Sequence, residues 1–227
     1  MAHAETVIVT GGASGLGRAV ASKVQTQGWR PIVLDRFGAQ GCECRTVDLA
    51  DGRAAEAVVR EVAERHGGVN AVVTCAGIDA CGPLRDVPAM DWERVVLVNL
   101  LGTAAVARAA LPYLQASGGR LVTVASTLGL RAMPDATAYC ASKFGVVGFT
   151  RALAAEVAGQ VGVTLLLPGG MDTAFFSGRA EQYRPGPGAQ LNPPEDVAEA
   201  VLFALRTPPS CEVRELVVTP SREPSWP

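Results

Sequence analysis

The sequence predicts a single-domain α/β fold over residues 1–227, a doubly wound sheet of about seven parallel strands with helices on both faces. Short apolar runs alternate with longer segments of helical periodicity along the chain. These short runs are continuous stretches of Val, Ile and Leu, as expected for strands covered on both faces. Right-handed crossovers between such strands give a doubly wound sheet, and ligands then bind at the carboxyl ends of its strands.

Each element follows from its local pattern. Strands are expected at 6–10, 32–35, 71–74, 120–125, 161–167 and 215–219, with one more strand before Asp48. Helices are expected at 15–28, 54–66, 92–114, 138–158 and about 193–206. Asn192 is the expected N-cap of the last helix, with Pro193 in its first position. The Pro- and Gly-rich stretch before that helix predicts a substrate loop at about 171–192.

Composition and charge exclude several classes of protein. Twenty Lys and Arg against 22 Asp and Glu give a net charge of −2, without the basic cluster that nucleic acid requires. The apolar runs are too short to cross a bilayer, and no signal-peptide pattern precedes the first strand, so we expect a cytoplasmic protein without a membrane partner. The six cysteines are irregularly spaced, which predicts reduced thiols and no metal site.

A glycine-rich turn follows the first strand and leads directly into a helix. Glycine tolerates the unusual backbone angles of such a turn and lets a pyrophosphate approach the backbone, while the helix N-terminus supplies free N–H groups. This position, in the first strand-to-helix turn, is typical of a Rossmann fold that binds a dinucleotide. The candidate contacts in the turn are Gly11, Ser14, Gly15, Leu16 and Gly17.

The residues after the second strand bear on the choice of cofactor. Asp35 ends that strand, where an acidic side chain can accept hydrogen bonds from the ribose hydroxyls and would repel a 2′-phosphate. Arg36 follows it and could instead pair with such a phosphate. The sequence therefore favours NAD, with NADP as the alternative.

A second group of residues suggests proton-transfer chemistry. Tyr139 and Lys143 stand four residues apart on one face of a predicted helix, where an ammonium group should lower the pKa of a phenol. Ser126 follows the strand at 120–125, and Asn99 lies in a predicted helix. In order and spacing, Asn99, Ser126, Tyr139 and Lys143 resemble the catalytic tetrad of the short-chain dehydrogenase/reductase family.

That resemblance covers nearly the whole chain and implies further contacts. Asp48 and Leu49 resemble the family's pair beside the adenine, and Cys75, Ala76 and Gly77 match its Asn-Asn-Ala-Gly turn only in the last two residues. The segment that holds the nicotinamide carboxamide is matched by Pro168, Gly169, Met171 and Thr173. The resemblance also implies a homotetramer or homodimer, assembled through the helices at 92–114 and 139–158.

By the same resemblance, Tyr139 exchanges a proton with the reacting oxygen, Ser126 hydrogen-bonds that oxygen, Lys143 binds the nicotinamide ribose, and Asn99 holds a water. The substrate is then a small-molecule carbonyl or alcohol. Apolar loop residues could line its pocket, namely Leu128, Leu130, Met133, Phe175, Phe176 and Tyr183. Arg131, Arg179 and Arg184 are expected to be solvated and receive no role.

The main hypothesis is therefore a short-chain oxidoreductase that moves hydride between NAD and a secondary alcohol or ketone. An NADP-dependent 3-oxoacyl or polyketide-type ketoreductase is the alternative within the enzyme class, which Arg36 permits. A dinucleotide-sensing binding protein is the alternative outside it, but binding alone would not need Tyr139 and Ser126 beside Lys143.

Overall fold

The computed structural model describes residues 4–223, 225 and 226, and they form one parallel sheet of seven strands in the order β3-β2-β1-β4-β5-β6-β7. The predicted fold is confirmed. The strands are β1 (Thr6–Thr10), β2 (Arg30–Asp35), β3 (Glu43–Thr46), β4 (Ala71–Thr74), β5 (Arg120–Val124), β6 (Gly162–Pro168) and β7 (Glu215–Val218). The strand order reverses between β1 and β4, and a crevice opens at such a switch point in doubly wound sheets.

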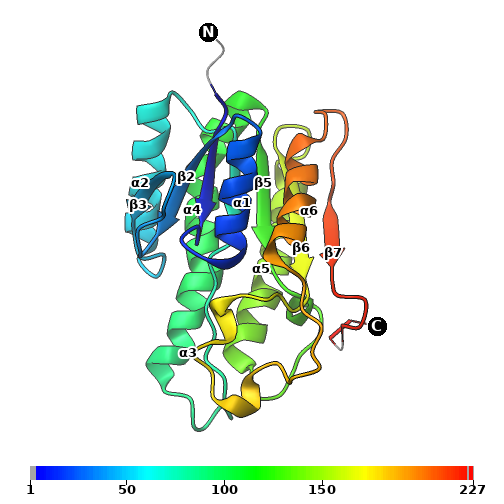
Figure 1. Cartoon of the computed structure of the whole chain (residues 1–227). Helices are drawn as coiled ribbons and strands as arrows, with labels where there is room; N and C mark the ends of the chain where they lie inside the picture. The colour runs from blue at the N-terminus through cyan, green and yellow to red at the C-terminus, as the bar shows by residue number, and fades with distance from the viewer. Residues whose placement is uncertain (1–3, 224, 227) are drawn as a thin grey trace.

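Helices cover both faces of this sheet (Figure 1). They are α1 (Gly15–Thr26), α2 (Gly52–His66), α3 (Ala89–Val96), α4 (Thr103–Ser117), α5 (Thr137–Glu156) and α6 (Pro194–Arg206). On one face, α1 and α6 pack together over Val7, Val9 and Val73 of the central strands. On the other face, α2, α4 and α5 enclose a second core around Ile8, Ile32 and Val72.

The helix predicted at 92–114 is longer and is not regular. A π-helical segment, η1 (Leu97–Gly102), joins α3 to α4 without a break. Ala89–Ser117 is apolar and long enough to pass a composition test for a membrane span, but 56% of its most apolar window is buried in the protein. Packing against α2, α5 and the sheet accounts for its apolar character.

Two boundary expectations are wrong in detail. Helix α6 begins at Pro194, and its N-cap position is held by Pro193 without a side-chain hydrogen bond. Asn192 does not cap the helix, because its backbone forms a β-bridge with Met171. The bridge fastens the end of the loop segment 171–192 to its beginning, at the carboxyl edge of the sheet, where this segment appears in yellow and orange in Figure 1.

Candidate active site

A cavity of about 1100 Å³ opens along the carboxyl edge of the sheet and extends from the turn after β1 to the loop segment 171–192. Every cofactor contact expected from the sequence lines it. These residues are Gly11, Ser14, Gly15, Leu16, Gly17, Asp35, Arg36, Asp48, Leu49, Cys75, Ala76, Gly77, Tyr139, Lys143, Pro168, Gly169, Met171 and Thr173. Ser126 lines the cavity as well, whereas Asn99 lies behind its wall.

The glycine-rich turn is packed too closely for side chains. Gly11 has a φ of +69°, and a Cβ there would lie 2.8 Å from the Cα of Ala76. Ser14 occupies the N-cap of α1 without a side-chain capping bond, and the first turn holds no acidic residue. The first N–H groups of α1 therefore face the cavity with their partial positive charge uncompensated, which fits a pyrophosphate.

Asp35 supports the turn as well as facing the cavity. Its Oδ2 accepts a hydrogen bond from the Ala13 N–H at 3.0 Å, and its Oδ1 accepts one from the Phe37 N–H at 3.0 Å. Each carboxylate oxygen retains a lone pair for a further donor. Arg36 is exposed and lies over the Phe37 ring, 5.4 Å from its centroid.

The next strand end adds an ion pair that the sequence did not suggest. Arg94 of α3 donates to Asp48 Oδ2 at 2.6 Å, and the Ala50 N–H donates to Asp48 Oδ1 at 3.0 Å. Burial by itself would raise the pKa of Asp48. The two hydrogen bonds outweigh burial and, together with the charges of Arg94 and Arg36, hold this pKa below its usual value. Asp48 is therefore fixed as an anion at this end of the cavity.

The turn after β4 closes the floor of the cavity despite Cys75 standing at the family's Asn position. The Ala76 N–H donates to the Thr10 hydroxyl at 3.1 Å, which ties this turn to β1. Burial raises the pKa of Cys75 to about 12, although the nearby Lys143 ammonium opposes the rise. Cys75 is thus an uncharged thiol packed against the core formed with α1 and α6.

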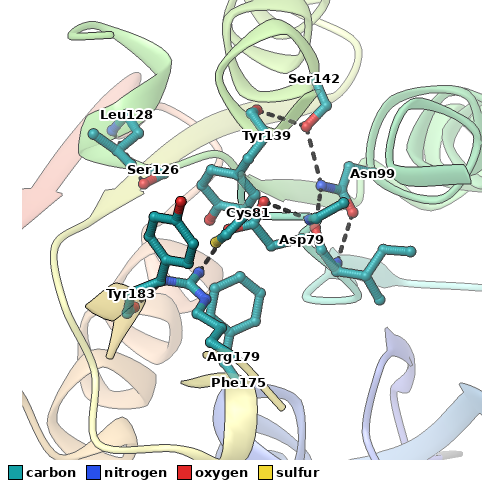
Figure 2. Close-up of polar contacts among 12 residues, drawn as sticks. Asp79, Cys81, Asn99, Ser126, Leu128, Tyr139, Ser142, Phe175, Arg179 and Tyr183 are labelled. Atoms are coloured by element: carbon teal, nitrogen blue, oxygen red, sulfur yellow. Dashed lines mark hydrogen bonds and ion pairs between the residues drawn. The ribbon is translucent and has the colours of Figure 1, made fainter. Parts of the chain in front are cut away.

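Tyr139 stands in the first turn of α5, beside Ser126 at the end of β5. Figure 2 shows their side chains pointing into the same space, with Tyr183 from the loop segment 171–192. Burial raises the pKa of Tyr139 to about 12, and the hydrogen bond from Ser126 opposes the rise. The expected lowering of this pKa by Lys143 is not found: loss of solvation is the largest influence, and Lys143 is not among the groups that shift this pKa.

Lys143 is buried one helical turn farther along α5. Its Nζ donates to the Val124 carbonyl at 2.8 Å and lies 5.6 Å from the centroid of the Tyr139 ring. Burial lowers its pKa to about 8. Lys143 therefore remains mostly protonated near neutral pH, but only narrowly.

Asn99 is held by the π-helical segment and braces the loop after β4. Its Oδ1 accepts from the Ile78 N–H at 2.8 Å, and its Nδ2 donates to the Ile78 carbonyl at 2.9 Å and to Ser142 Oγ at 3.0 Å. A Cβ on Gly77 would lie 3.6 Å from Lys143 Nζ and 3.7 Å from Asn99 Oδ1. Asn99 and Lys143 thus flank the same glycine.

The opposite wall is formed by the loop after β6 and by the C-terminal tail. Glu223 Oε2 accepts from the Gly170 N–H at 2.8 Å, and Ser225 Oγ bonds the Thr127 hydroxyl at 2.6 Å. Thr173 packs near Gly15, where a Cβ would approach the Thr173 methyl group to 3.3 Å. The tail, for which the sequence suggested no role at the site, therefore supports two loops of the cavity.

The loop segment 171–192 covers the end of the cavity at which Tyr139 and Ser126 lie. Five of the six expected apolar residues line the cavity there; Leu130 does not, because it packs against Val146 and Val147 inside the protein. Arg179 is not solvated as expected, since its Nη2 pairs with Asp79 Oδ2 at 2.7 Å. Arg131 and Arg184 are exposed.

The family model described as short chain dehydrogenase matches residues 5–184 of this chain. An uncharacterized oxidoreductase of Staphylococcus aureus strain USA300 is 30% identical over 229 residues, covering 95% of this chain and 97% of that protein. Glycine betaine reductase ATRR of Emericella nidulans is 32% identical over 241 residues, or 97% of this chain, but this chain spans only 19% of that longer protein.

Two solved structures share the fold along almost the entire chain. Thermoplasma acidophilum aldohexose dehydrogenase superposes with a TM-score of 0.87 at 25% identity, over 96% of this chain and 93% of its own. An actinorhodin polyketide ketoreductase variant with NADPH gives 0.84 at 30% identity, over 95% of this chain and 96% of its own. This chain therefore belongs to the short-chain dehydrogenase/reductase family and is an NAD(P)-dependent oxidoreductase.

Proposed function

We propose that the protein interconverts a secondary alcohol and a ketone, with NAD as the hydride carrier and Tyr139 as the acid/base. The observation that carries this proposal is the placement of Tyr139, Ser126 and Lys143 around one end of a cavity whose other end is a dinucleotide-type turn. A proton donor, a hydrogen-bonding hydroxyl and a buried cation at one position suit a carbonyl oxygen that gains negative charge.

In reduction, Tyr139 gives its phenolic proton to the carbonyl oxygen while the Ser126 hydroxyl donates a hydrogen bond to that oxygen. When bound, the nicotinamide cofactor supplies the hydride in reduction and accepts it in oxidation. The Lys143 ammonium lies near the Tyr139 ring and stabilises the phenolate left by the proton transfer. Asn99 positions the loop after β4 beside Lys143.

The preference for NAD rests on Asp35. Its carboxylate is held at the end of β2 by the N–H groups of Ala13 and Phe37, so its charge stays at the place where a 2′-phosphate would come close. The ribose hydroxyls of NAD can donate to the remaining lone pairs of the carboxylate.

Tyr139→Phe tests the proton-transfer assignment. We expect the variant to bind NADH as the parent does and to lose at least about 100-fold in turnover, the usual contribution of general acid–base catalysis. Tyr113→Phe is the matched control, because Tyr113 packs against the core under α2 and α4, away from the cavity. Cofactor fluorescence and turnover of a ketone panel are the measurements, and a Tyr139→Phe enzyme with near-parental kcat contradicts the mechanism.

An NADP-dependent 3-oxoacyl or polyketide-type ketoreductase is the second candidate. The exposed Arg36 guanidinium favours it, as does the similarity to an actinorhodin polyketide ketoreductase with NADPH. Titration with NADH and NADPH separates the two candidates. Tighter binding of NADPH, lost on Arg36→Ala, would replace NAD with NADP as the cofactor, whereas tighter binding of NADH, lost on Asp35→Ala, supports the first candidate.

We also infer where the protein acts and how it assembles. The chain acts as one catalytic domain in the cytoplasm on a small molecule, without nucleic acid or membrane partners. It assembles as a homodimer or homotetramer, which would cover the exposed apolar side chains of Leu97, Leu101 and Phe144 on η1 and α5. Light scattering of the purified protein measures the assembly, and a monomer would contradict it.

A further inference from the structure

An ion pair joins the loop after β4 to the loop segment 171–192 at the substrate end of the cavity. Arg179 Nη2 lies 2.7 Å from Asp79 Oδ2, and the two side chains are only 18% and 6% exposed. Asp79 Oδ2 also accepts from the Cys81 thiol at 3.1 Å, and Asp79 Oδ1 accepts from the Ala80 N–H at 2.7 Å. The carboxylate is therefore held rigidly, and its charge is screened little by water.

Aromatic contacts connect this ion pair to Tyr139. The Arg179 guanidinium lies 4.8 Å from the Phe175 ring centroid and 4.6 Å from that of Phe176. The Phe175 ring in turn lies 5.6 Å from the Tyr139 ring, tilted by 55°. Figure 2 shows this cluster of Asp79, Arg179, Phe175 and Tyr139. The cluster brings a cation and an anion close to the phenol, along with an aromatic wall.

The two members of the pair act on the Tyr139 hydroxyl with opposite sign. After burial and the Ser126 hydrogen bond, the charge of Asp79 raises the pKa of Tyr139, and that of Arg179 lowers it. Lys143 and Cys140 on α5 also lie near Tyr139, as does Cys81 in the loop after β4. Tyr183 approaches from the loop segment 171–192, and its hydroxyl donates at 3.3 Å to Asp135, which precedes α5. Arg179 is the cation that the loop segment 171–192 brings to balance Asp79.

We propose that the Asp79–Arg179 ion pair is a positioning device for Tyr139, which closes the loop segment 171–192 over the phenol and keeps the charge around its hydroxyl balanced. Neither side chain exchanges a proton with the substrate. The proposal deepens the proposed function and rests on it in taking Tyr139 as the acid/base.

The test removes one charge at a time and then both. The variants Arg179→Met, Asp79→Asn and Asp79→Asn/Arg179→Met preserve much of the side-chain volume. In alcohol oxidation with NAD, kcat rises with pH as Tyr139 loses its proton, so the midpoint of this rise reports on the phenol. We expect Arg179→Met to move it up by about one pH unit, Asp79→Asn to move it down by a similar amount, and the double variant to return close to the parent.

Arg184→Met is the matched control for loosening of the loop. Arg184 is exposed and donates to the carbonyls of Arg179 and Ser177, so its loss disturbs the same segment without touching Asp79. A merely structural role predicts that all variants raise KM and leave the midpoint unchanged. The proposal is overturned if natively folded single variants do not move the midpoint or move it in the same direction, or if Arg184→Met moves it as far.

A second readout separates this proposal from the proposed function. The ultraviolet absorbance of the phenolate follows Tyr139 directly, after subtraction of the Tyr139→Phe spectrum, over the pH range in which circular dichroism remains native. Opposite displacements of the absorbance curve by the two single variants support the ion-pair proposal even if no alcohol is turned over. Curves that coincide with the parent overturn it, whatever the activity.

Discussion

Gly17 gives the most direct test of how the glycine-rich turn is built. It lies in the first turn of α1, and a Cβ at this position would stand 2.3 Å from the Gly11 carbonyl oxygen and 2.6 Å from its carbon. Both atoms belong to the backbone of the turn, which cannot rotate away as a flexible side chain does. Gly17→Ala therefore has to displace either the turn or the start of the helix.

The size of the effect follows from the overlap. Overpacking of a well-packed site costs about 1–3 kcal/mol, and replacing a helical glycine with alanine returns up to about 1 kcal/mol. A net loss of about 1–2 kcal/mol lowers the Tm of a protein of this size by roughly 2–8 °C. The displaced N–H groups would also no longer point at the phosphates, so we expect NADH binding to weaken by at least about tenfold.

Gly52→Ala is the matched control. Gly52 begins α2, and a Cβ there meets only the Ala105 methyl group at an ordinary 3.4 Å. Thermal denaturation and cofactor fluorescence on the parent and both variants make the comparison. The explanation of the turn is refuted if Gly17→Ala matches the parent in both Tm and NADH affinity, or if Gly52→Ala loses as much.

Two further predictions concern buried groups. The Lys143→Met variant should be more stable than the parent at pH 7. Burial lowers the pKa of Lys143 from its usual 10.5 to about 8, so the charged lysine costs the parent about 3 kcal/mol, partly offset by its bond to Val124. That advantage should shrink between pH 8 and pH 10.5, where the parent lysine becomes neutral, and a constant difference in Tm across this range contradicts the lowered pKa. Iodoacetamide at pH 8 should label the exposed Cys211 at least about 100-fold faster than Cys75 and Cys81, whose pKa values burial raises to about 12. Peptide mass spectrometry gives the rates, and equal labelling of Cys75 and Cys211 would show that the thiol is not buried as described.

The parts of the fold that local patterns specify were predictable. Six strands could be placed because an apolar run or a turn signal marks each one, and right-handed crossovers between parallel strands predicted a doubly wound sheet. The order of the strands was not predicted, because handedness alone does not fix it. The edge strand β3 could not be delimited, because Glu43–Thr46 is partly exposed and carries no apolar run. The π-helical segment has no sequence signal either; it was visible only as part of a long apolar helix.

At the site, the difference lies between contacts near in sequence and contacts far apart. Tyr139 and Lys143 share one helix face, so their pairing can be read from spacing alone. The Asp79–Arg179 pair joins residues 100 positions apart, and the Glu223–Gly170 bond joins residues 53 apart. Such contacts depend on how two loops meet at the edge of the sheet, which periodicity does not determine.

In the proposed mechanism, the two shifted pKa values at the centre of the site require Tyr139 and Lys143 to act together. Near pH 7, Tyr139 is a neutral phenol and Lys143 is a charged ammonium. Burial favours the neutral form of both, so it raises the pKa of Tyr139 and lowers that of Lys143. A phenol with a pKa of about 12 is a weak acid, so donating its proton requires an oxygen whose negative charge is increasing and a cation that stabilises the phenolate. Ser126 and the reacting carbonyl provide the first condition and Lys143 the second. Stabilisation of this phenolate also strengthens the hold on the Lys143 proton, since each charge opposes the loss of solvation of the other. Removing either side chain should therefore impair the role of the other in the proton transfer. The loss of activity in a double variant should then be smaller than the sum of the two single losses, expressed as free energies.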